Sequence, residues 1–195
     1  MTEPDGKVIW NTLRARPDLR GLLSGLGLSL TGLSAVVGFA SIYATKEIGF
    51  TLEDTVKLFV VLQLAAVVGA LATGPWQDRS GARPVLLGAL GLWGLVSVGA
   101  WLSRSAESFY AVAALAGLGM GWLQSAGRAA VAEITPEGQQ GEVFGLWGFA
   151  GKLAGIVGPV VFGWLASMVG LREAVILNGV WFILGAWILW GVDKR

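Results

Sequence analysis

A single lysine lies deep inside an otherwise uncharged stretch of the chain. Lys152 is nine residues past Val143, which corresponds to about 14 Å along a helix. A charge at that depth in a bilayer is costly and usually faces a cavity or a partner. We therefore expect Lys152 to line a path for a solute. The alternative is a structural role, in an ion pair with an acid such as Glu133 or in hydrogen bonds to helix carbonyls.

Two glycines and two polar residues share one face of the stretch that follows Phe109. Gly117, Gly121, Gln124 and Arg128 are separated by four, three and four residues, which is the spacing of one helical face. Gln124 is a candidate for binding a solute, and Arg128 has two candidate roles. It can bind the solute, or it can close a cytoplasmic gate together with an acid.

Ser34 and Trp122 complete the candidate solute-binding residues. Ser34 belongs to a stripe of hydroxyl residues in the first apolar stretch, and Trp122 offers an indole ring on which a solute can stack. Hydroxyls in membrane helices often bond to their own backbone, and tryptophans often face lipid, so both residues have an alternative structural interpretation. The acids available for a gate with Arg128 are Asp78, Glu133 and Glu142.

The composition excludes several classes of function. Hydrophobic residues make up 54% of the 195 residues and charged residues only 14%, against about 25% in a typical soluble domain. The chain has no cysteine and no histidine, which excludes a zinc site and a Cys–His or Ser–His nucleophile, so we expect neither an enzyme nor a metal or other cofactor. A net charge of +1 provides no basic patch for nucleic acid, and no nucleotide-binding loop is present for ATP.

Six apolar stretches are long enough to cross a bilayer, which takes about 20 residues. Together they predict an all-α, multi-pass integral membrane protein. We expect residues 1–20 to form a cytoplasmic segment and residues 21–195 to form one six-helix transmembrane domain. The predicted spans are residues 22–45, 58–75, 84–102, 109–134, 143–171 and 174–192.

Lysines and arginines orient the chain, because they accumulate on the cytoplasmic side of membrane proteins. Eight of them precede the first span, lie between the second and third spans, or end the chain. The four on the opposite side are Lys46, Lys57, Arg104 and Arg172. We therefore expect both termini to lie in the cytoplasm, with the protein in a bacterial-type plasma membrane.

The sequence contains an internal repeat. A shift of 89 residues superposes span one on span four, span two on span five and span three on span six without a gap. Arg83 then matches Arg172, and Gln63 falls opposite Lys152, which makes Gln63 a further candidate for the solute path. The copies are offset by an odd number of spans, so they lie inverted in the membrane, as in many transporters. They cover residues 21–105 and 108–195.

Residues 74–84 form a charged motif between the second and third spans, with the pattern G-x-x-x-D-R-x-G-x-R. We expect a tight turn, in which Gly74 lets one helix end pack closely and Gly81 adopts a positive φ angle. Asp78 can accept hydrogen bonds from the N-terminus of a neighbouring helix. Arg79 and Arg83 can pair with carboxylates or lipid phosphates. We expect a cytoplasmic gate here that includes Glu133 and Glu142; the alternative is merely a charged loop.

At these residues the sequence resembles the major facilitator superfamily, whose signature loop between the second and third helices has this pattern. Residues 16–20 also look like the beginning of a facilitator. The segments 124–128, 134–137, 142–146, 151–152 and 158–163 are similar to the late helices of the vacuole-effluxer-like branch. The resemblance implies one six-helix half of the facilitator fold and a carrier of small solutes that works by alternating access.

The chain differs from that family in size, because facilitators have about twelve helices and this chain has six predicted spans. Six spans return the chain to its starting side, so two copies share one topology and a parallel C2 homodimer can rebuild the complete fold. In this arrangement spans one and four line the cavity, and spans two and five form the dimer contact. The alternatives are one half of a split heteromeric transporter and a non-transporting membrane subunit.

The expected solute is a small polar molecule such as a sugar or an amino acid. The effluxer-like segments favour an amino acid, whereas the neutral amides and tryptophans favour a sugar. The sequence leaves both passive transport and coupling to protons open. No Asp or Glu lies in the middle of a span to carry protons. Proton coupling requires a titratable group in the path, and the sequence offers Lys152, or Glu133 near the cytoplasmic end.

Overall fold

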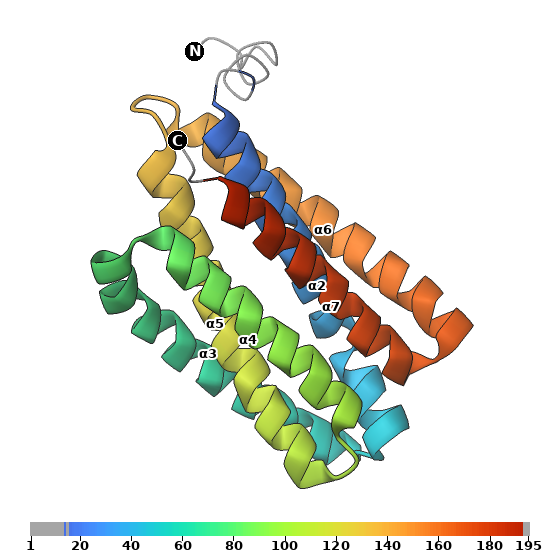
Figure 1. Cartoon of the computed structure of the whole chain (residues 1–195). Helices are drawn as coiled ribbons and strands as arrows, with labels where there is room; N and C mark the ends of the chain where they lie inside the picture. Colours follow the sequence, from blue (N-terminus) through green and yellow to red (C-terminus); the bar gives the residue numbers. More distant parts are fainter. Residues whose placement is uncertain (1–13, 15, 193–195) are drawn as a thin grey trace.

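The computed structural model describes Arg14 and residues 16–192 (Figure 1). Within these residues, six helices are long and apolar enough to span a membrane, which confirms the predicted number of spans. They are α2 (Pro17–Tyr43, continued by the π-helical turn η1, Ala44–Ile48), α3 (Leu52–Ser80), α4 (Ala82–Leu102), α5 (Ala106–Ile134), α6 (Gln140–Val169) and α7 (Leu171–Gly191). Most of the predicted cytoplasmic segment, residues 1–20, lies outside the described residues.

The second span is longer than the sequence predicts. α3 begins at Leu52, because Thr51 and Asp54 form a capping box in which each side chain accepts a hydrogen bond from the other residue's backbone N–H. It continues through Pro75 to Ser80, so Asp78 and Arg79 belong to its last turn. The apolar pattern marks only the part of a helix inside the hydrocarbon, and here both helix ends extend beyond it.

The helices form two three-helix units related by a pseudo-twofold axis. The most extensive contacts join α3 to α5, α2 to α6 and α7, and α4 to α5 and α7. Exchanging α2 with α5, α3 with α6 and α4 with α7 maps this set of contacts onto itself. Figure 1 shows α4 and α7 side by side, with α3 and α6 at opposite edges, and the start of α2 at the same end as the end of α7.

Equivalent positions of the two repeats share the same local geometry. The described glycines with positive φ form two pairs 89 residues apart, Gly49 with Gly138 and Gly81 with Gly170. In the core, Trp93 and Phe182, also 89 residues apart, stack with their ring centroids separated by 5.1 Å. Two equivalent residues touch each other only where the symmetry axis passes between them. These pairs show that the two halves of the domain are inverted copies of one three-helix unit.

Glycines let helices of one repeat touch helices of the other repeat backbone to backbone. A Cβ added to Gly69 of α3 would overlap the carbonyl of Leu118 in α5, and one added to Gly158 of α6 would overlap the carbonyl of Thr31 in α2. Gly69 and Gly158 are 89 residues apart, so the same contact is built twice. A Cβ at Gly74, by contrast, would meet nothing within 4 Å. The expectation that Gly74 permits close packing at the end of α3 is therefore wrong.

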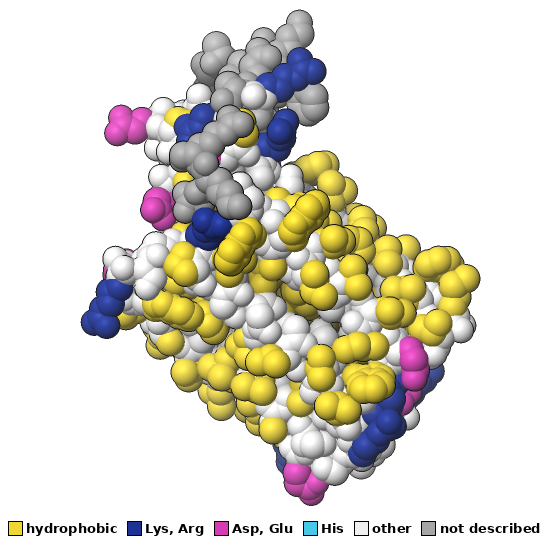
Figure 2. Space-filling view, viewed as in Figure 1, with side chains coloured by type: hydrophobic (Ala, Val, Ile, Leu, Met, Phe, Trp, Pro, Cys, Tyr) yellow, Lys and Arg dark blue, Asp and Glu magenta, His cyan; other side chains and the backbone are white. Residues whose placement is uncertain are grey.

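The surface of the bundle is apolar between two charged ends. Figure 2 shows hydrophobic side chains covering the face of α4 and α7, with charged side chains gathered toward the two ends. α3 and α6 are the least buried spans, and each exposes large apolar side chains such as Leu71 and Ile156. Apolar surface of this extent is stable in a bilayer and unstable in water.

Candidate solute-binding groove

Three of the predicted solute-binding residues meet in one groove. Gln63 of α3 lines it together with Gln124 and Arg128 of α5. Gly121 also lines the groove and packs closely against the carbonyl of Ala66 in α3. The other lining residues are Ala66, Val67, Ala70, Met120, Ser125, Ala129, Ala132 and, from α6, Phe144.

Arg128 is the only charged group among the described residues that line this groove. Its guanidinium carbon lies 5.8 Å from the centroid of the Trp147 ring in α6, which is a cation–π contact. Its N–H donors lie in the plane of the group and have no hydrogen-bond or ion-pair partner within the described part of the chain. The predicted gate contacts of Arg128 to Asp78, Glu133 or Glu142 are thus not formed in this conformation.

Lys152 lies outside the groove, on an exposed face of α6. It is twelve residues from Gln140, or about 18 Å along the helix, which places it in mid-span. A Cβ at Gly148 or Gly155, one turn to either side, would meet nothing within 4 Å, so this face is open rather than closely packed. Within residues 16–192, Lys152 makes no ion pair with Glu133.

Ser34 and Trp122 are also outside the groove. The Trp122 ring lies 4.8 Å from the ring of Trp76 and fills the space above Gly88 of α4. Trp122 therefore packs α3 and α4 onto α5, which corresponds to its structural interpretation. Ser34 is half-buried on α2. Its neighbour Thr31 donates a hydrogen bond to the carbonyl of Gly27, the backbone bonding expected of hydroxyls in membrane helices.

The predicted gate residues lie at the end of the bundle where α3 and α5 end and α4 and α6 begin. Arg83 and Glu133 line one hollow there. Arg83 also donates a hydrogen bond to the carbonyl of Trp190, and its guanidinium lies 5.3 Å from the Trp190 ring. Asp78 and Arg79 are exposed in the last turn of α3, and Glu142 is half-buried in the first turn of α6.

The turn of the charged motif is shorter than expected. Gly81 alone separates α3 from α4, with φ +77° and ψ 169°. A positive φ at this position favours glycine, as the sequence predicts. The motif is thus mainly the last turn of one helix and the first turn of the next, and its charged side chains project from helices rather than from a loop.

An arginine to which the sequence analysis gave no structural role forms a clamp at the opposite end. Arg172 at the start of α7 is 9% exposed and donates hydrogen bonds to the carbonyls of Trp101 and Ser103, at 2.9 and 2.8 Å. It also contacts Glu47 of η1 at 3.3 Å. Its repeat partner Arg83 bonds to Trp190, the repeat partner of Trp101. The repeat was therefore the signal that could have identified this contact.

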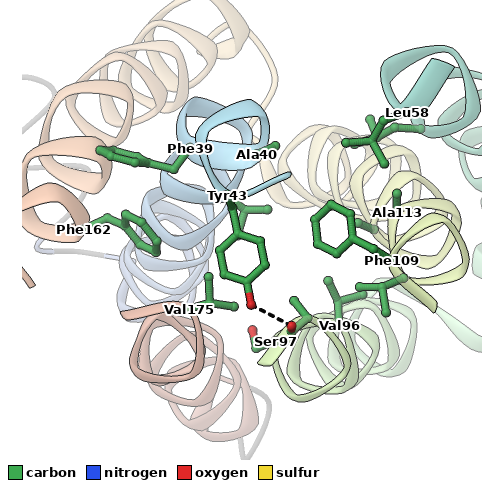
Figure 3. A pocket seen from close by; sticks show the side chains of 15 residues that line it. Phe39, Ala40, Tyr43, Leu58, Val96, Ser97, Phe109, Ala113, Phe162 and Val175 are labelled. Carbon is green, nitrogen blue, oxygen red and sulfur yellow. Dashed lines mark hydrogen bonds between the residues drawn. The ribbon is translucent and has the colours of Figure 1, made fainter. Parts of the chain in front are cut away.

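A small cavity of about 60 Å³ lies among all six spans, in the half of the bundle that contains the clamp (Figure 3). Phe39, Tyr43, Phe109 and Phe162 contribute aromatic rings to its wall. The Tyr43 hydroxyl donates to the carbonyl of Ala100 at 2.8 Å, and the Ser97 hydroxyl to that of Trp93 at 3.0 Å. Because both hydroxyls are already bonded, this cavity offers little to a polar solute.

The six apolar spans, the inverted repeat and the charged turn at Gly81 agree with a comparison to known families. The profile of the Major Facilitator Superfamily matches residues 10–195. The chain belongs to the Major Facilitator Superfamily. With six apolar spans, this facilitator is an integral multi-pass membrane protein.

Curated relatives match this facilitator over part of their length. The uncharacterised MFS-type transporter Rv1250 of Mycobacterium tuberculosis is 30% identical over 147 residues, covering 74% of this chain and 25% of the relative. The 4-hydroxybenzoate transporter PcaK of Pseudomonas aeruginosa is 33% identical over 117 residues, or 60% and 26%. Autophagy-related protein 22-1 of Phaeosphaeria nodorum is 29% identical over 204 residues, or 94% and 36%. The chain thus spans between 25% and 36% of the length of these relatives.

Proposed function

We propose that this facilitator is a secondary transporter that moves a small polar solute, such as a sugar or an amino acid, by alternating access. The observation that carries the proposal is a polar groove of two amides and a guanidinium, Gln63, Gln124 and Arg128, between the membrane-spanning helices α3 and α5. Amides both donate and accept hydrogen bonds, so they can replace the water around hydroxyl or amide groups of a solute. Membership of a transporter family supports this function.

A second copy of the chain is the proposed partner. The start of α2 and the end of α7 lie at the same end of the bundle (Figure 1). Two copies can therefore share one orientation in the membrane and meet about a twofold axis along the membrane normal. The exposed apolar faces of α3 and α6 would then pack against each other between copies. In this arrangement α2 and α5 face the shared cavity, and α4 and α7 face lipid. The competing proposals are a different six-helix partner and a non-transporting subunit.

The driving force is proposed to be either the solute gradient alone or a proton gradient. Lys152 and Glu133 are the proposed titratable groups for proton coupling, because both are exposed and neither forms an ion pair within residues 16–192. The proposed location is a bacterial-type plasma membrane with both ends of the chain in the cytoplasm. In that orientation the hollow at Arg83 and Glu133 opens to the cytoplasm.

Mass measurement and uptake on the same preparation test this function. We expect the purified chain to have twice its mass of 20.4 kDa in detergent, and to transport a small polar solute into liposomes. A lone monomer that still transports would contradict the homodimer. A stable homodimer that accumulates none of a broad panel of sugars, amino acids and organic acids would favour the non-transporting subunit.

A further inference from the structure

The charges of the groove point to one class of solute. We infer that the groove defined by Gln63, Gln124 and Arg128 binds a hydroxylated carboxylate anion in preference to a neutral sugar or an amine-bearing amino acid. In this assignment Arg128 holds the carboxylate, and the two glutamines hold hydroxyl groups. The inference deepens the proposed transport function and rests on it for its biological meaning, whereas the binding preference itself can be measured without transport.

The surroundings of Arg128 suit an anion that has two oxygens. The guanidinium carbon lies 5.8 Å from the centroid of the Trp147 ring, a cation–π contact that occupies no hydrogen-bond acceptor. The N–H donors of the guanidinium form a planar fork that matches the two oxygens of a carboxylate. No acceptor within the described part of the chain occupies them. A guanidinium held in this way gains most from a ligand that brings two oxygens.

The groove also disfavours an amine. An ammonium group needs a carboxylate or several oxygen acceptors when it leaves water, and it is repelled by a neighbouring guanidinium. The described lining of the groove contains no acid. Glu133, the acid one helical turn and one residue beyond Arg128, instead lines the separate hollow with Arg83. An amino acid would therefore place its positive charge beside Arg128 without a counter-ion.

The remaining polar groups of the groove are neutral. Gln124 lies four residues before Arg128 on the same face of α5, and Gln63 faces it from α3. Ser125 adds a hydroxyl. Amides and hydroxyls are suited to hydroxyl groups, because each can donate and accept a hydrogen bond. A solute with a carboxylate at one end and hydroxyls along its length matches this order of groups.

A lipid phosphate is the competing anion. Arg128 lies six residues before Ile134, the last residue of α5, which is about 9 Å by the helical rise. Lipid headgroups come close to that depth. Gln124 and Gln63 lie deeper in the span, however, where a lipid presents only hydrocarbon. Their presence in the same groove favours a solute over a headgroup.

A binding assay on the full chain in lipid-free detergent tests the assignment. The probes are matched pairs that differ in charge: gluconate against glucose and glucosamine, and lactate against propane-1,2-diol. We expect the carboxylates to raise the melting temperature and the neutral or amine-bearing partners to leave it unchanged. Arg128→Gln should weaken carboxylate binding about 10- to 100-fold, the range for loss of a charged hydrogen bond. Arg128→Lys should fall between, because lysine keeps the charge without the fork.

Arg104→Gln is the matched control, because it removes one exposed arginine from the other end of the bundle. It should bind the carboxylates as the parent does. Failure of both carboxylates to bind, or binding that Arg128→Gln and Arg128→Lys leave unaltered, would overturn the inference. So would stabilisation by phosphatidylglycerol alone that Arg128→Gln abolishes. Carboxylate binding that depends on Arg128 without exchange across liposomes would uphold the site and count against transport.

Discussion

Arg172 shows how one guanidinium can hold several elements together. Its N–H donors reach two backbone carbonyls at the end of α4 and the carboxylate of Glu47 in η1. A lysine could not serve these acceptors in the same plane, because its ammonium is a compact point charge on a flexible stem. Arg172 therefore connects the start of α7 to the ends of α4 and α2 at one end of the bundle.

Arg172→Gln should destabilise the folded chain by about 2–3 kcal/mol, the scale for loss of hydrogen bonds to a charged group. The control Arg104→Gln, at an exposed position on the same side, should change stability by less than about 0.5 kcal/mol. Unfolding of both variants by denaturant in one detergent measures the difference. Equal midpoints for the two variants would show that the clamp contributes no stability.

Lys152 presents a different case, because its side chain has no partner within residues 16–192 and its face of α6 is open. Lys152→Gln should fold normally, since glutamine occupies the equivalent position 63 of the other repeat. We expect weaker solute binding or loss of any pH dependence of uptake. Lys57→Gln, which removes a lysine from an exposed ion pair with Glu53, is the control. Uptake with unaltered affinity and pH profile would make Lys152 a structural residue.

At the scale of the helices, backbone contact decides which glycines matter. Gly69 brings α3 against the carbonyl of Leu118 in α5, and Gly158 repeats this contact between α6 and α2. Small residues at such crossings allow close van der Waals packing, which is the main attraction between helices in lipid. Gly74 lies in the same helix as Gly69 but faces open space.

Gly69→Ala should therefore destabilise the chain by about 1–3 kcal/mol, because the added methyl group forces α3 away from α5. Gly74→Ala should be neutral or stabilising by up to about 1 kcal/mol, since alanine has the higher helix propensity. Thermal unfolding of the two single variants makes the comparison within one helix. A larger loss at Gly74 than at Gly69 would contradict this account of the contact between α3 and α5.

At the scale of the whole molecule, the carboxylate of Asp78 forms no hydrogen bond or ion pair with the described residues of its own chain. It lies in the last turn of α3, where the helix dipole disfavours a carboxylate. The N-terminus of α6 in a second copy, near Glu142 and Val143, would favour it by about 0.3–1 kcal/mol at an exposed site. Two such contacts in a homodimer would hold the cytoplasmic side closed.

Asp78→Asn should open that side more often, because it keeps the shape of the side chain and removes its charge. The chain has no native cysteine, so a single Ser125→Cys reporter in the groove can be labelled selectively. Two lost contacts predict labelling from the cytoplasmic side about 3- to 30-fold faster. Glu53→Gln at the opposite end is the control. An unchanged labelling rate in Asp78→Asn would show that this carboxylate does not close the gate.

The sequence by itself determined the features that depend on local pattern. The six spans follow from the length of the apolar stretches, and the inverted repeat follows from the 89-residue shift. The common face of Gln124 and Arg128 follows from helical periodicity, and the turn at Gly81 from the need for a positive φ. Each of these properties is set by residues close together in the chain or by repetition of the same pattern.

Only the tertiary structure decided which helix faces meet. It brought Gln63 of α3 beside Gln124 and Arg128 of α5, placed Trp147 under the guanidinium, and set Trp122 against Trp76 rather than in the groove. In a bilayer, a face that packs on another helix and a face that touches lipid are equally apolar, so hydropathy does not separate them. The choice is made by close fit between helices, which depends on residues far apart in the sequence.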